Sequence, residues 1–381
     1  MMYEMKGIRY AEGLLKFLLA TAMIWLGCIA LVSCDQGDTN AGEAEAHITL
    51  TLCLKGTDTD NNTRIGQSEG KQIASRSEDD ETDEPGTEME NSIDLSRFHV
   101  VFYQTNQQMA GILQNMVLVH LGGNIYRLTG SLPVDNKVLV GNHFEGKMVV
   151  YANFEMSEAD LQKDYNDTGI AGKSFGYEAN PKYLPMWGVK KVDFTLAAGK
   201  RQDFSDIDLL RAVAKVKVNL SNDMKKNGWS IHSMKLINYN NEGYCMPIKY
   251  AECEQTASLT HEEFEHFKDS KQTDGITMKD NVPIYLPEYK NNVNDGADKC
   301  VIKLKLASNG KVELVDGSDK EKEYTLRFID YTDQGTEGTT TNDIVRDHYY
   351  IFEVYKGSNG HNLVKLTVKK WNVRNHEEIV M

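Results

Sequence analysis

AHITLTLCL, residues 46–54, alternates large apolar side chains with polar or smaller ones. The large apolar residues are Ile48, Leu50, Leu52 and Leu54. This period of two predicts a β-strand with one face in a core. A polar stretch of roughly forty residues separates the strand from the next apolar run, so residues distant in sequence must bury it.

Short alternating runs continue from Leu95 onward and predict an all-β protein. Tyr (18) outnumbers Phe (12), and Val, Ile and Thr recur, as is typical of strands. The predicted strands cover residues 98–103, 115–120, 125–130, 147–153, 192–196, 209–220, 229–238, 284–286, 301–306, 324–329, 349–355 and 364–371. Their spacing, with Gly, Asn and Asp turns between them, favours β-sandwiches.

Two domains and minor short helices complete the predicted architecture. The N-terminal β-sandwich covers residues 93–205 and the C-terminal one residues 206–381. One helix is predicted over 157–165 with Ser157 as its N-cap, and another from the capping box at Thr260.

The N-terminal residues 1–33 have the composition of an export signal. Basic residues precede an apolar stretch, Phe17–Val32, which ends in Leu31-Val32-Ser33-Cys34. This tetrad resembles the lipobox of bacterial lipoproteins and predicts a lipid, such as palmitate, on Cys34. An uncleaved membrane anchor is the alternative, because the stretch is nearly long enough to span a bilayer. The abrupt change to polar residues after Cys34 favours the lipobox.

The segment that follows the first strand is polar and acidic. From Gly56 to Asn91 it has almost no large apolar residue, so residues 65–92 are predicted to form a flexible, exposed acidic loop. A trypsin-like protease could reach Arg64-Ile65, and Arg76-Ser77 is the second choice. Residues 34–64 would then be a removable propeptide that carries the first strand. Ordinary surface arginines are the alternative.

Charge and motifs exclude several classes of protein. A net charge of −14 argues against binding nucleic acid, which needs basic patches. The sequence contains no GxSxG, P-loop or HExxH motif, so an enzyme is not expected. Trp187, Trp229 and Trp371 could form a sugar-stacking platform, although aromatic residues of small sandwiches more often lie in the core.

No metal or cofactor is expected either. An EF-hand-like spacing from Asp58 to Glu69 has Thr63 where the loop needs glycine. His261 and His266 are five residues apart, which breaks the zincin spacing. The later cysteines, Cys245, Cys253 and Cys300, have no zinc-type spacing, and both a Cys245–Cys253 disulfide and buried thiols remain open.

Five segments give the chain a more specific character. They are Tyr183–Gly188 (YLPMWG), Leu209–Val216 (LLRAVAKV), Ile284–Tyr289 (IYLPEY), Ile344–Tyr350 (IVRDHYY) and Trp371. In this order they resemble elements of the fimbrillin family of the FimA/Mfa type, the subunits of the lipoprotein-derived (type V) pili of Bacteroidia. Asp347 stands where the family often has Asn. The similarity covers essentially the whole mature chain.

The resemblance implies two transthyretin-like sandwiches and assembly by donor-strand exchange. A trypsin-like or arginine-specific protease would cut at Arg64-Ile65 and free the strand of Ile48, Leu50, Leu52 and Leu54. A C-terminal strand of another subunit would then fill its place. The donor candidate is residues 364–381, with Val364, Leu366, Val368, Val373, Ile379 and Val380 as its apolar residues. The charged residues after Trp371 make this tail a poorer apolar stripe than residues 48–54.

The expected function is therefore that of a structural subunit of a cell-surface fimbria that supports adhesion. Its partners would be other copies or related fimbrial subunits, the processing protease, and the outer membrane through the lipid of the precursor. One alternative is a tip or accessory adhesin of the same pilus, which binds a host protein or glycan. The other is a surface glycan-binding lipoprotein that does not polymerise.

Overall fold

The computed structural model describes residues 45–54, 87–122, 125–256, 271–292, 297–332, 335–358 and 360–371. Most of these residues lie in β-strands, so the all-β prediction is confirmed. The helical elements are α2 (Glu88–Asn91), α3 (Glu158–Leu161), α4 (Asn222–Lys226) and the 3-10 turns η1 (Leu95–Arg97) and η2 (Ile170–Gly172). Within the described ranges no helix has the length and apolar character needed to cross a membrane.

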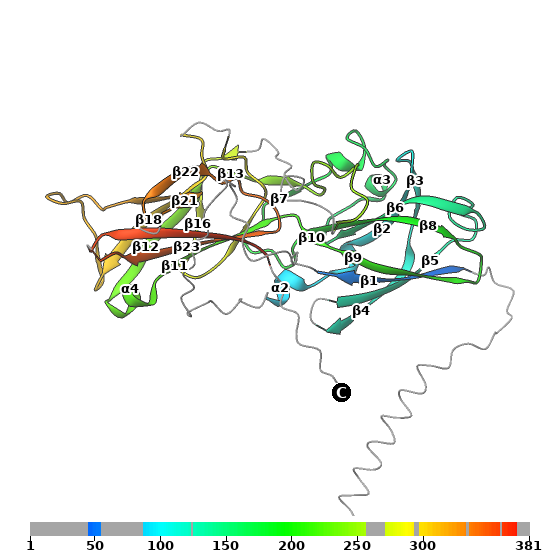
Figure 1. Ribbon diagram of the computed structural model, residues 1–381, viewed down its shortest axis with the longest axis horizontal. Helices are drawn as coiled ribbons and strands as arrows, with labels where there is room; N and C mark the ends of the chain where they lie inside the picture. The colour runs from blue at the N-terminus through cyan, green and yellow to red at the C-terminus, as the bar shows by residue number, and fades with distance from the viewer. Residues whose placement is uncertain are drawn as a thin grey trace, which may run out of the picture. The chain divides into compact units, whose positions relative to one another are not determined.

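The first two sheets enclose one core. Sheet I has the strand order β4-β5-β1-β9, and sheet II has the order β10-β8-β6-β2-β3 (Figure 1). Their strands are β1 (Ala46–Cys53), β2 (Phe98–Gln104), β3 (Met109–Ile112), β4 (Gln114–Gly122), β5 (Ile125–Leu132), β6 (His143–Ala152), β8 (Met186–Thr195), β9 (Arg201–Asp208) and β10 (Leu210–Arg211). Leu50 of sheet I and Phe102 of sheet II belong to the same core, hence the pair forms a β-sandwich.

Two further sheets enclose a second core. Sheet III has the order β17-β11-β23-β24 and sheet IV the order β16-β12-β18-β19, with β20 also paired to β18. Their strands are β11 (Ala214–Leu220), β12 (Trp229–Ile237), β16 (Ile276–Thr277), β17 (Ile284–Leu286), β18 (Val301–Ser308), β19 (Lys311–Val312), β20 (Tyr324–Arg327), β23 (His348–Lys356) and β24 (Asn362–Lys370). Val218 and Phe352 of sheet III share this core with Leu236 and Leu304 of sheet IV.

Three two-stranded sheets lie outside these four. They pair β7 (Ser174–Gly176) with β14 (Glu242–Tyr244), β13 (Tyr239–Asn240) with β15 (Lys271–Gln272), and β21 (Ile329–Tyr331) with β22 (Glu337–Thr341). The transthyretin-like arrangement that the resemblance implied stays a prediction.

Sheet II is buried on both faces, which explains the nearly continuous apolar runs of β2 and β6. Phe102 and Val150 point into the first core, whereas Val101 and Tyr151 belong to a third cluster. That cluster is completed by side chains from the long connections around Tyr165, Cys245 and Tyr250. A strand covered on both faces has no polar side to alternate with.

The strand pairing changes from the first sandwich to the second later than the predicted boundary at residues 205–206. β9 and β10 pair with strands of the first sandwich, and β11 is the first strand of the second. The predicted strand 209–220 is thus two strands in different sheets. Alternation cannot reveal this change of sheet, because Arg211, Ala214 and Lys215 are all buried.

Other sequence predictions have mixed outcomes. Ser157 is the N-cap of α3 as predicted, but the helix ends at Leu161 rather than at residue 165. Trp187 and Trp371 are buried in different clusters, and Trp229 packs against the second core, so the three form no platform. All cysteines that the structure describes are buried thiols without a disulfide. The predicted helix at Thr260 and the EF-hand-like segment lie outside the described residues.

Candidate functional site

β1 occupies an interior position of sheet I, between β5 and β9 (Figure 1). It is antiparallel to β5, from Ala46 opposite Leu132 to Cys53 opposite Ile125. It is parallel to β9 on its other side. Because both of its backbone edges are hydrogen-bonded, loss of β1 would expose two rows of N–H and C=O groups that face each other across a groove.

The side chains that β1 directs inward fill the first core. Ala46, Ile48, Leu50, Leu52 and Leu54 are each no more than 1% exposed. The predicted apolar face is therefore buried as the alternation indicates. Complete burial of four large aliphatic side chains stabilises the fold by about 6–12 kcal/mol, so β1 is held strongly.

α2 follows the acidic segment in sequence and contacts both sandwiches. Here the prediction of an exposed loop up to residue 92 is wrong, because Glu90 is completely buried. Its carboxylate accepts hydrogen bonds from Lys215 Nζ at 2.7 Å and from the Tyr285 hydroxyl at 2.6 Å. The missed signal is a capping box, in which Thr87 and Glu90 bond each other's backbone N–H.

Arg211 extends this contact to the C-terminal end of the described chain. Its guanidinium donates to the Glu90 carbonyl at 3.1 Å and to Asn91 Oδ1 at 2.7 Å, and it lies 3.4 Å from Asp347 Oδ1. The guanidinium carbon also sits 4.6 Å from the ring centre of Trp371, which stacks on Tyr285. We call Glu90, Arg211, Lys215, Tyr285, Asp347 and Trp371 the junction cluster.

Opposite charges balance in the junction cluster. Two carboxylates, Glu90 and Asp347, face two cations, Arg211 and Lys215. Buried charges are tolerated only when they are paired and hydrogen-bonded, so each member depends on the others. The cluster joins α2, β10, β11 and β17 to Asp347, which precedes β23, and to Trp371, which follows β24.

The segments that carry the family resemblance converge on this region. Glu288 of the IYLPEY segment pairs with Arg346 of the IVRDHYY segment at 2.8 Å, and both are buried. Asp347 has a φ of 55°, a left-handed conformation in which Asn and Asp are enriched, which explains their exchange at this position. Gly188 lies so close to β9 that a Cβ would come within 2.6 Å of the Asp208 carbonyl. These segments thus contribute a buried ion pair and close backbone packing to the fold.

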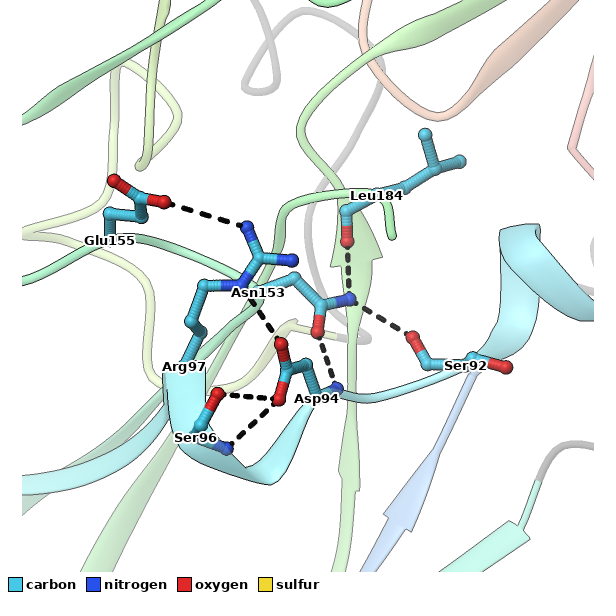
Figure 2. Close-up of polar contacts among 7 residues, drawn as sticks. All are labelled: Ser92, Asp94, Ser96, Arg97, Asn153, Glu155 and Leu184. Carbon is cyan, nitrogen blue, oxygen red and sulfur yellow. Dashed lines mark hydrogen bonds and ion pairs between the residues drawn. The ribbon is translucent and has the colours of Figure 1, made fainter. Parts of the chain in front are cut away.

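The chain after α2 is fastened to the first sandwich by Asn153 (Figure 2). The Asn153 amide donates to the carbonyls of Ser92 at 3.0 Å and Leu184 at 2.7 Å, and its oxygen accepts from Asp94 N–H at 2.8 Å. Asp94 in turn accepts from Ser96 and from Arg97 Nε. The hydrogen bonds from Ser96 and Arg97 hold the pKa of Asp94 below its usual range. These contacts attach the chain directly after α2 to the first sandwich.

A cleft of about 300 Å³ lies beside Asn153 and Arg97. Arg97, Phe175, Tyr177, Tyr183 and Tyr285 are among its lining residues. Arg97 lies over the ring of Tyr183, with its guanidinium carbon 5.5 Å from the ring centre. Its Nη1 atom lies 3.9 Å from Glu155 Oε1 (Figure 2). Aromatic faces and charged groups in one cleft can hold a small polar ligand with an apolar face.

The structure separates the residues predicted for strand exchange. Ile48, Leu50, Leu52 and Leu54 lie together in the first core, whereas Val364, Leu366 and Val368 lie in β24 and pack against the second core. Cys34, Arg64-Ile65, Arg76-Ser77, Val373, Ile379 and Val380 lie outside the described residues. Within the described ranges, no group of three or more His, Cys, Asp or Glu side chains is placed to bind a metal ion.

Comparison with known proteins identifies the class to which this architecture belongs. Residues 75–377 match the family model described as fimbrillin-A associated anchor proteins Mfa1 and Mfa2. The match covers most of the chain, and the chain belongs to this family. No curated protein matches it.

Several solved structures are similar to this chain. A protein of Parabacteroides distasonis described as a candidate cell adhesion protein has a TM-score of 0.51 at 13% identity, over 87% of this chain and 100% of that one. The fimbrilin FimA of Porphyromonas gingivalis has a TM-score of 0.46 at 13% identity, over 87% and 100%. The tip fimbrial protein Mfa3 of the same species has a TM-score of 0.45 at 12% identity, over 86% and 100%.

Proposed function

We propose that this chain is a non-catalytic subunit of a cell-surface fimbria. It is exported as a lipoprotein modified at Cys34 and joined to a neighbour by exchange of β1. One observation carries the proposal: the first strand of the mature chain fills an interior position of sheet I. An arginine, Arg64, follows it in a polar segment. Membership in the fimbrial family supports the same role.

Proteolysis would make this strand replaceable. While β1 is covalently attached, its high effective concentration prevents competition by another strand. A cut after Arg64 turns it into a separate peptide held only by its ladder and apolar face. The emptied groove is a template for an incoming strand. Repetition of this head-to-tail contact gives an open filament. Glu90 and Asn153 keep α2 attached to the body after the cut.

The N-terminus of the assembled protein tests this proposal. Protein sheared from the cell surface as fibres is expected to begin at Ile65, whereas the membrane-bound precursor keeps the lipid on Cys34. N-terminal sequencing of both fractions from one culture provides the control. An intact, lipidated N-terminus in assembled fibres would contradict cleavage.

An accessory position in the same pilus is the second candidate. The family model is described as one of anchor proteins, and an anchor would keep the lipid on Cys34 together with β1. A tip adhesin would instead use a ligand site, for which the cleft beside Arg97 and Tyr183 is the candidate. Loss of adhesion to glycan-coated surfaces in a Tyr183→Ala variant with unchanged fibres would favour the adhesin.

A further inference from the structure

We infer that the outer edge of β4 is a docking surface for β4 of a second copy of this chain. The two strands pair side by side in antiparallel orientation, with a two-fold axis near Val119. This contact lies outside the position of β1 and needs neither cleavage nor strand exchange. It follows from the place of β4 in its sheet, its lack of charge and its exposed side chains.

β4 is the outermost strand of sheet I (Figure 1). Among the strands that the structure describes, only β5 pairs with it, so its other side has no strand beside it. Such an edge is a template for pairing with another chain. Proteins normally protect an edge strand by keeping it short or by placing charged residues or proline on it.

The other outer strands of sheets I to IV have this protection. β9 carries Arg201 and three aspartates, and β24 carries Lys365 and two further lysines. β3, β10, β16, β17, β19 and β20 are no longer than four residues each. β4 has nine residues, Gln114–Gly122, with no Lys, Arg, Asp, Glu or Pro among them. Among these outer strands, β4 alone is both long and uncharged.

β4 also exposes apolar side chains. Val117 and Val119 are 56% and 50% exposed, and they lie on one face because side chains alternate along a strand. Leu121, at 49%, extends this apolar surface toward the turn to β5. On the opposite face Met116 and Leu118 pack against the first core but are only partly buried. A strand placed beside β4 covers side chains on both faces.

The lack of charge in β4 suits a second copy of the same strand. In an antiparallel pair with a two-fold axis, a residue near the axis faces itself or a close neighbour, so a charged residue there would meet a like charge. With the axis at Val119, Val117 of each copy lies opposite Leu121 of the other, and the exposed apolar side chains cover one another.

The charge on the neighbouring strand does not oppose this pairing. Arg127 of β5 lies opposite Val119. The same arginine of the second copy would be three strand spacings away, about 14 Å. That separation exceeds the screening length of about 8 Å at physiological salt, so the two guanidinium groups repel each other weakly.

The contact is small. Nine strand residues span about 30 Å, and a strip about 10 Å wide along this edge covers roughly 300 Å² per copy. A stable complex buries about 800 Å² per partner, so a single pair of copies should dissociate readily. In fibres of the kind proposed above, many such contacts would act together and hold two fibres side by side. This consequence rests on the proposed function, whereas the pairing itself does not.

Hydrogen exchange of the uncut, full-length chain, measured by mass spectrometry, tests the pairing. Amides of β4 that point away from β5 become protected when two copies pair. Exchange over residues 114–122 is expected to slow about threefold between about 5 and 500 µM protein. Exchange over the buried strand β6 should not change with concentration, and it reports whether the chain is folded.

Val119→Lys should abolish this dependence on concentration, because it places two ammonium groups at the axis. Val315→Lys is the matched control, since Val315 lies between β19 and β20 and is 46% exposed. This control should behave as wild type. If exchange over β6 shows that Val119→Lys is unfolded, Val117→Lys on the same face takes its place.

Rapid exchange of β4 at every concentration would overturn the inference, because the second copy would not cover this edge. Slow exchange at every concentration would also overturn it, since the edge would then be covered within one copy. A concentration dependence that persists in the folded lysine variant on β4 would rule out pairing about Val119. The chain stays uncut throughout, so none of these results depends on the exchange of β1.

Discussion

At the scale of single residues, the stability of this protein depends on buried charges that neutralise one another. Glu90 has no exposed surface and binds Lys215 and Tyr285, which come from the second sandwich. Removing one member of such a pair strands the other charge in a low dielectric, which costs more than the pair itself contributes. Contacts of this kind explain how α2, a helix of only four residues, keeps a defined position in the fold.

We expect Glu90→Gln to lower the free energy of unfolding by about 3–5 kcal/mol, because Lys215 would stay buried without its carboxylate. Urea denaturation measures this loss. The double variant Glu90→Gln/Lys215→Met should recover part of it, since no charge is then left unpaired. A loss below about 1 kcal/mol for the single variant would show that the pair is hydrated in solution.

Asp160 gives a stability that depends on pH. Burial disfavours its charged form, but hydrogen bonds from Lys163 and Lys173, at 2.8 and 2.7 Å, outweigh this and hold the pKa of Asp160 below its ordinary 3.8. A carboxyl with a lowered pKa stabilises the fold above the unfolded value and loses this contribution as pH falls through the folded pKa.

Asp160→Asn should therefore cost about 1–2 kcal/mol at pH 7, and the difference from wild type should shrink below about pH 4. Thermal melts of both proteins from pH 7 to pH 3 measure the effect. The neighbouring exposed Glu158→Gln is a suitable control and should follow wild type. A difference that stays constant down to pH 3 would contradict the assigned shift.

At the scale of elements, β1 combines an ordinary strand sequence with an unusual position. Its alternation reports one buried face, and Leu50 and Leu52 are indeed buried in the first core. Its neighbours, β5 and β9, are far from it in sequence. The strand therefore gains its stability from long-range pairing, and in the proposed strand exchange another strand would take over this pairing.

Leu50→Ala should lower the free energy of unfolding of the uncut protein by about 2–5 kcal/mol, because it leaves a cavity in the first core. Thr51→Ala, on the opposite and partly exposed face of the same strand, should change it by less than about 1 kcal/mol. Urea denaturation of the two variants makes the comparison. Equal losses of unfolding free energy in the two variants would contradict the assignment of one buried face and one partly exposed face to β1.

At the scale of the whole molecule, the two sandwiches share residues. Trp371 follows β24 of the second sandwich, yet it is buried in the first core and stacks on Tyr285 with ring centres 5.7 Å apart. Arg211 and Lys215 both lie over its ring. One side chain thus links the stability of the two cores, and the sandwiches are expected to unfold together.

Trp371→Ala is expected to lower stability by about 3–5 kcal/mol and to split one calorimetric transition into two, because the shared contact is lost. Differential scanning calorimetry gives both readouts. Trp229→Ala is the matched control, since Trp229 is only half-buried and packs beside Lys356. A single, unshifted transition in Trp371→Ala would contradict the coupling.

The sequence by itself determined many of the strands, the buried face of β1 and the all-β class, whereas β3, β9 and β22 were not predicted. Alternation is a local property, so β1, β11 and β18 could be located, along with Ser157 as a cap. The ordered family segments indicated the fimbrial class. The inward residues of β1 were therefore predictable, whereas the neighbours that bury them were not.

Only the tertiary structure decided the partners of each strand. It placed β1 between β5 and β9, moved the change of sandwich to β11 and buried Glu90 in a segment that reads as an acidic loop. The physical reason is that a charged residue near a polar run is normally hydrated, and only a partner such as Lys215, 125 positions later (215 − 90), makes its burial favourable. Long-range pairs of this kind leave no periodic pattern in the sequence.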